Sequence, residues 1–147
     1  MKKIIIFIFI IIAILSTGLY IYLNYLSNYN IAQKENIKFE IYKDENIDGS
    51  KLTTLINKAI DLNMRNEVKK DNKGKYVDNG ENSINIDVKF IDNDSVFNIE
   101  KIYNGGMATF LSYYGDIIFK CNDVQYHEKT GKVKYMLFEQ VTQWLSF

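Results

Sequence analysis

Cys121 and His127 are the single cysteine and the single histidine of the chain, and they are the residue types of a nucleophile and its general base. Both lie in one segment that is predicted to be a β-strand, six positions apart. A strand rises about 3.3 Å per residue, so they would lie roughly 20 Å apart, whereas proton transfer needs a contact of about 3 Å. One Cys and one His also leave too few ligands for a zinc site. We therefore predict no catalytic residue, and we expect a buried cysteine.

A second candidate is a calcium loop. Asp44, Asn46 and Asp48, followed by Gly49, match the first half of the pattern D-x-[DN]-x-[DN]-G. Oxygen ligands at alternate positions suit Ca²⁺, but the twelfth position, which should supply a bidentate glutamate, is Leu55. The alternative is a polar loop that caps the following helix. We predict no metal and no other cofactor. These three side chains are kept as a candidate calcium loop that matches only half of the pattern.

Aromatic side chains form the third set. Tyrosine and tryptophan are favoured at protein interfaces, and their rings can also stack on sugars. The alternative is that these rings fill a small core. The candidate interaction surface consists of Tyr103, Tyr113, Tyr114, Tyr126 and Trp144.

The segment from Ile4 to Leu26 is 23 residues without a charge. As a helix it would be about 34 Å long, which exceeds the ~30 Å thickness of a bilayer's hydrocarbon core. Lys2 and Lys3 precede it, and several tyrosines gather around its far end, where such rings prefer the headgroup level. We predict a membrane anchor over 1–26, in contact with the lipid bilayer through Ile4 to Leu26. The two lysines place the N-terminus in the cytoplasm and the rest outside the plasma membrane.

A cleaved signal peptide is the alternative, since Ser16-Thr17-Gly18 resembles a peptidase site. Apolar character resumes at once with Leu19, and this favours an uncleaved, single-pass anchor. Cleavage after Gly18 would give a secreted protein. In both cases the domain leaves the cytoplasm.

The remaining chain is long enough for one small domain. Residues 27–36 are polar and are predicted to be a stalk, and 37–147 to be the extracytoplasmic domain. Alternation of Ile37, Phe39 and Ile41 with polar residues predicts a first strand over 37–42. An apolar stripe with helical spacing then predicts a helix that starts at Asp48 or Ser50 and ends at Asn63 or Asn66.

Further along, alternation predicts a strand over 84–90, and a short strand is expected over 75–77 before a type I′ turn at Asn79-Gly80. A helix is expected over 107–114, after a less regular stretch from residue 99. Segments 117–127 and 132–141 are predicted to form a hairpin, with Gly131 in the left-handed conformation. The fold class is α+β: an N-terminal transmembrane helix, then a small antiparallel sheet with one or two helices on one face.

Composition excludes one class of partner. Lysine and arginine number 18, and so do aspartate and glutamate, so the chain is formally neutral. A general nucleic-acid binder would be basic, and we expect no nucleic-acid partner.

Gly49–Asn63, Tyr103-Asn104-Gly105-Gly106 and Phe119-Lys120-Cys121 resemble segments of short membrane-anchored proteins of low-GC Gram-positive bacteria. That group implies no activity and no site residues. One hydrophobic helix followed by a small α+β head is also similar to pilins and pseudopilins. Those proteins are cleaved after a glycine ahead of the apolar stretch, and here only Met1, Lys2 and Lys3 precede Ile4.

These observations predict a non-catalytic, membrane-anchored module that binds or assembles with another component of the cell envelope, either a protein or a cell-wall polymer. A pilin-like or secretion-system subunit is the alternative, followed by an enzyme acting on envelope substrates.

Overall fold

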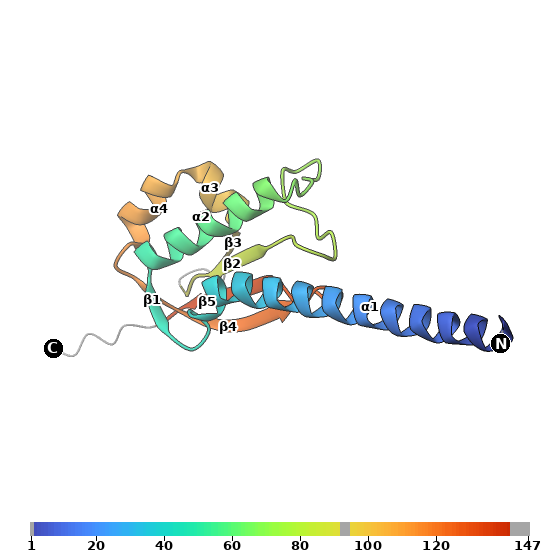
Figure 1. The fold of residues 1–147 in the computed structure, drawn as a ribbon. Coiled ribbons are helices and arrows are strands. Elements are labelled where there is room, and N and C mark those ends of the chain that lie inside the picture. The colour runs from blue at the N-terminus through green and yellow to red at the C-terminus, as the bar shows by residue number, and fades with distance from the viewer. Residues whose placement is uncertain (1, 92–94, 142–147) are drawn as a thin grey trace.

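The longest element of the computed structural model, which describes residues 2–91 and 95–141, is helix α1 (Lys2–Glu40). Its 39 residues correspond to about 58 Å. The N-terminal part projects alone from the remaining domain, which we call the head, and the last turns pack onto it (Figure 1). The polar residues 27–36 thus belong to the same helix as the apolar segment, and no separate stalk lies between that segment and the head within the described residues.

The predicted strand over 37–42 is wrong, because α1 continues to Glu40 and a turn follows. The side chains that α1 buries are Ala32, Asn36 and Phe39, which have helical spacing. Ile37 and Ile41, which suggested the alternation, are both about half exposed, at 57% and 52%. Apolar residues at alternate positions therefore suggested a strand, although only Phe39 among them faces the core.

Strand β1 (Asn46–Asp48) leads directly into helix α2 (Gly49–Arg65), which confirms the predicted core helix. The Asp48 carboxylate accepts a hydrogen bond from the Lys51 backbone N–H at 2.7 Å, and Asn66 ends the helix. Its buried stripe includes Leu52, Leu55, Ile56, Ala59 and Ile60.

The remaining elements are β2 (Asn85–Lys89), β3 (Val96–Asn98), α3 (Ile99–Gly105), α4 (Met107–Tyr114), β4 (Ile118–Tyr126) and β5 (Val133–Gln140). The α+β class, the strand at β2, the helix at α4 and the β4–β5 hairpin are confirmed. Gly131 has a φ of +67°, as expected for that turn.

The five strands form one sheet in the order β1-β4-β5-β2-β3. The sheet is mixed and not wholly antiparallel, because β2 and β5 run parallel, with Ile86 opposite Met136. Hydrophobic alternation carries no information on strand direction, so the sequence could not distinguish these pairings.

Three helices, α2, α3 and α4, lie on one side of the sheet, where one or two had been expected (Figure 1). The side chains that the sheet turns toward them are buried, among them Ile47, Ile86, Val88, Phe119, Met136 and Phe138. The alternate residues of the same strands, such as Lys120 and Asp87, are partly or fully exposed. One face of the sheet is thus core and the other is a polar surface.

The segment between α2 and β2 differs from expectation. Residues 75–77 form only a single bridge, between Lys70 and Tyr76, and no strand. A type I′ turn needs positive φ at both central residues, and here Gly80 has it but Asn79 does not. The Asn79 side chain accepts hydrogen bonds from the backbone N–H groups of Glu81, Asn82 and Ser83, and so forms an irregular loop.

Candidate functional site

The projecting part of α1 is the first functional feature of the structure. Its large apolar side chains are exposed along its length: Phe7 is 64% exposed and Leu15 is 66% exposed. A contiguous apolar surface of this size is uncommon on soluble monomers and requires lipid or protein to cover it. Among the helices of the described residues, α1 alone is both long enough and apolar enough to cross a membrane. It lies near the N-terminus, where a signal sequence would also lie.

The second feature is the junction between α1 and the head. Asn36 is 2% exposed and pairs with the end of the β4–β5 hairpin on both sides of its amide. Its Nδ2 donates to the carbonyl oxygen of Gly131 at 2.8 Å, and its Oδ1 accepts from the backbone N–H of Val133 at 2.8 Å. The Asn36 side chain thus makes the two hydrogen bonds that the backbone of a neighbouring strand would otherwise make to the hairpin, and it fixes α1 against the hairpin.

Two further contacts hold the same junction. Lys132 Nζ lies 2.8 Å from a carboxylate oxygen of Glu35. The Tyr126 hydroxyl donates to Glu40 Oε1 at 2.7 Å, and burial together with this carboxylate raises the pKa of Tyr126 to about 12. Tyr126 was expected on an interaction surface, but the structure uses its hydroxyl to attach α1.

His127 lies next to this junction and is 2% exposed. Its Nε2 is 2.8 Å from the carbonyl oxygen of Ser83, so Nε2 carries the proton and donates it there. Its Nδ1 makes no hydrogen bond and lies 3.6 Å from Asp78 Oδ1. The histidine thus joins the loop before β2 to the β4–β5 hairpin, which is a structural role.

Asp78 is the charged partner of this contact. The Gly80 backbone N–H donates to its carboxylate at 2.8 Å and, against the opposing effect of burial, lowers the pKa of Asp78. The nearby His127 and Lys134 side chains act in the same direction. The carboxylate therefore stays ionised and holds the loop over the hairpin.

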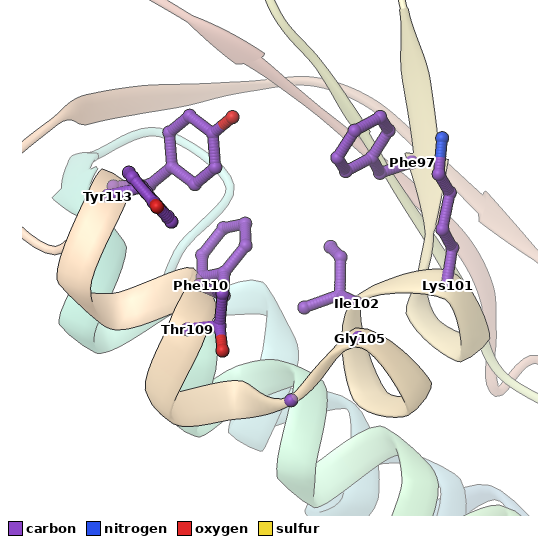
Figure 2. Close-up of a pocket in the computed structure, with 9 residues that line it drawn as sticks. Phe97, Lys101, Ile102, Gly105, Thr109, Phe110 and Tyr113 are labelled. Carbon is purple, nitrogen blue, oxygen red and sulfur yellow. The ribbon is translucent and has the colours of Figure 1, made fainter.

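The third feature is an open pocket beside α3 and α4. These two helices lie at the opposite end of the head from the projecting part of α1 (Figure 1). The pocket has a volume of about 200 Å³ and lies between β3, α3 and α4. Figure 2 shows Phe97 and Lys101 on one side of the opening, with Phe110 and Tyr113 on the other. Three separate elements therefore supply its walls.

Aromatic packing builds this pocket. Phe90 lies at the centre of a cluster in which ring centroids are 4.5 Å apart to Tyr114, 5.0 Å to Phe97 and 6.5 Å to Phe110. Lys101 Nζ lies 3.6 Å from the centroid of the Phe97 ring, a cation–π contact at the rim. The site is apolar with one cation.

Helix α4 takes its position from two glycines. Gly106, with a φ of +95°, separates α3 from α4, and this conformation is open to few other residues. At the other end of α4, a Cβ on Gly49 would lie 1.9 Å from the carbonyl oxygen of Tyr114. Gly49 had been considered for a calcium loop, but its role here is to let α2 approach the end of α4.

The predicted aromatic surface is brought together only in part. Tyr113 and Tyr114 line the pocket, and Tyr103 is exposed on α3 but is not among the lining residues. Tyr126 belongs to the α1 junction, and Trp144 lies outside the described residues. Phe97, Lys101 and Phe110 had not been identified, because only the fold brings them beside the tyrosines.

The other candidate residues lie apart from any shared site. Cys121 is buried, and burial raises the pKa of its thiol to about 11, which disfavours the thiolate that a nucleophile needs. Asn46 and Asp48 lie in strand β1, and Asp48 caps α2, so the half-motif that begins at Asp44 is not folded as a calcium loop. Across 2–91 and 95–141 no group of three or more His, Cys, Asp or Glu side chains could hold a metal ion.

Comparison of the chain with protein-family models, with curated proteins and with solved structures gave no match. The resemblance to membrane-anchored proteins of low-GC Gram-positive bacteria therefore stays an expectation, and the site has to be interpreted from its own geometry.

Proposed function

We propose that this chain is a single-pass membrane protein whose head lies outside the cytoplasm and binds a protein of the cell envelope without catalysis. The observation that carries the proposal is the open aromatic pocket at the end of the head away from the apolar helix (Figure 1). An anchor at one end and a pocket at the other suit a module that presents a binding surface away from the bilayer.

The dimensions of the pocket favour an inserted side chain over a free small molecule. Small-molecule sites occupy about 300–1,000 Å³, whereas this pocket is about 200 Å³ and wide open. Four of its nine lining residues are aromatic, and aromatic anchors in pockets supply most of the energy of many protein interfaces. A partner segment with one apolar side chain, and an acidic group beside Lys101, would fit this chemistry.

Residues on the rim are free to make such contacts. Tyr113 is 73% exposed, although it lies directly beside the buried ring of Phe110 and the partly buried ring of Tyr114. An exposed ring over an apolar pocket gains burial when a partner covers it. Non-catalytic binding is also supported by Cys121, whose thiol is buried and protonated at neutral pH.

Site-specific photocrosslinking tests this function. A photoreactive phenylalanine analogue is placed at Tyr113 of the full chain in the membranes of the producing cell, and the same analogue is placed at Asn57, an exposed position of α2, as the control. We expect a discrete adduct with a second protein from position 113 and none from position 57. Tyr113→Ala combined with crosslinking from Tyr103 should abolish the adduct. Unreacted monomer at position 113 would contradict the proposal.

A pilin-like subunit is the second candidate, and the continuity of α1 from its apolar half into the head favours it. Filament subunits of that kind are processed at the N-terminus by a prepilin peptidase. Intact mass of the chain recovered from membranes distinguishes the two: an unprocessed chain with a partner supports the binding module, and a processed chain in filaments supports the alternative.

A further inference from the structure

Helix α1 passes the tip of the β4–β5 hairpin at the place where it leaves the head (Figure 1). A groove lies between the two. Its volume is about 650 Å³. One wall is helical and carries Tyr25, Tyr29 and Ile31, and the other is the hairpin turn over residues 128–132. The open aromatic pocket between β3, α3 and α4, called the distal pocket below, is at the other end of the head. The two cavities share no lining residue.

The position of the groove along α1 determines its depth relative to the bilayer. If residues 4–26 cross the hydrocarbon core, as the proposed function requires, Tyr25 lies at its outer boundary and residues 27–31 occupy the next ~7.5 Å of helix. The headgroup layer on each side of a bilayer is about 5–8 Å thick. The groove therefore opens at the level of the phospholipid headgroups.

The chemistry of the walls suits that layer. The rings of Tyr25 and Tyr29 stack with centroids 6.5 Å apart and are both exposed, as interfacial tyrosines are. Opposite them, the Lys129 side chain is 74% exposed and its ion pair, 3.7 Å to an exposed Glu81, is weak and exchangeable. Lys132 is also in the wall, but its ammonium pairs with Glu35 at 2.8 Å, which leaves Lys129 as the cation available to an anionic headgroup.

We propose that this groove binds the headgroup of one phospholipid of the outer leaflet, with Lys129 donating to its phosphate and the tyrosine rings packing on its glycerol region. The inference rests on the proposed membrane anchor but not on the distal pocket. It makes the head a lipid-contacting body that sits directly on the bilayer, since α1 leaves no stalk between them.

Native mass spectrometry of the full chain in mild detergent tests this inference. The protein is offered phosphatidylglycerol or a phosphate-free diacylglycerol glycolipid with the same acyl chains. We expect one retained phosphatidylglycerol per chain and little glycolipid. Lys129→Glu should lower the retained phosphatidylglycerol about tenfold, because the variant removes an attractive charge near the phosphate and adds a repulsive one.

Lys120→Glu is the matched control, since Lys120 is an exposed lysine on strand β4 away from the groove. It should retain lipid as the wild type does, and unchanged melting temperatures would show that all three chains are folded. Equal retention of both lipids, equal retention by K129E, or a second copy of the chain in place of lipid would overturn the inference. Resistance of the chain to alkaline extraction from membranes tests the anchor separately, so an inserted chain without lipid preference refutes the groove alone.

Discussion

The two ends of the head are stabilised by different kinds of interaction. At the end next to the projecting helix, directed hydrogen bonds dominate, from Asn36 to the hairpin and from His127 to Ser83. At the far end, rings packed around Phe90 dominate, and an opening remains between them. Hydrogen bonds fix angles, whereas apolar contacts tolerate small displacements.

This difference matches what each end must do under the proposed function. A head held at a membrane needs a defined orientation to its anchor, and two hydrogen bonds from one buried amide provide it. A pocket that accepts a side chain benefits from walls that can adjust.

The largest effect is expected where the far end is most tightly packed. Gly49→Ala would place a Cβ 1.9 Å from the Tyr114 carbonyl oxygen, and the obstacle is backbone that cannot rotate away. We expect a loss of about 3 kcal/mol or more in the free energy of unfolding, measured by urea denaturation of the full chain in detergent. The control is Gly105→Ala, whose Cβ would meet no atom within 4 Å. Equal stability of both variants would contradict the close approach.

The end next to the projecting part of α1 should respond most to Asn36→Ala. The variant leaves the Val133 N–H and the Gly131 carbonyl without their buried partner, and we expect a loss of about 2–3 kcal/mol. Hydrogen exchange should also become faster in the β4–β5 turn while α4 is unaffected. Gln33→Ala, at an exposed position of the same helix, is the control. Faster exchange at α4 as well would mean that the two ends do not behave independently.

The sequence predicted the elements that depend on local signals. The α2 stripe, the alternation around Ile86 and Val88, and the hairpin with Gly131 each carry their evidence within a few residues. The end of α1 was mispredicted because Ile37, Phe39 and Ile41 alternate with polar residues. The residue that pairs α1 with the hairpin, Asn36, is polar. A buried amide that pairs with a distant hairpin leaves no periodic signal.

The candidate site was less accessible to prediction than the fold. Aromatic composition indicated Tyr113 and Tyr114, but Phe97 and Lys101 come from β3 and α3, on the other side of the pocket. The two sides of the pocket come together because Gly106 reverses the chain between α3 and α4, and because Gly49 allows the end of α4 to pack closely against α2. Tertiary contacts of this kind need the relative placement of several elements, which periodicity does not contain.

An intermediate effect is expected from His127→Ala. The Ser83 carbonyl would lose its buried donor, so we expect a loss of about 1–2 kcal/mol in the free energy of unfolding, again by urea denaturation. The loop before β2 should exchange hydrogen faster than in the wild type. Glu128→Ala, the exposed neighbour, should leave both measurements unchanged. A variant as stable as the wild type would show that His127 does not hold the loop.

The smallest effect is expected from the pH dependence of Asp78, which sharpens the comparison because it acts at one end only. Its pKa is lower in the folded chain than its ordinary value, so the ionised form stabilises the fold at neutral pH. That contribution is lost as the pH falls below about 4 and through the lowered folded-state pKa. Because its side chain is 48% exposed, solvent screening keeps the contribution below about 1 kcal/mol. We expect the stability of wild type over Asp78→Asn, followed by thermal melts from pH 7 to pH 3, to shrink as the pH falls. A difference that stays constant or grows toward acid would mean that the carboxylate does not act through its charge, and that hydrogen bonding alone holds the end of the head next to α1.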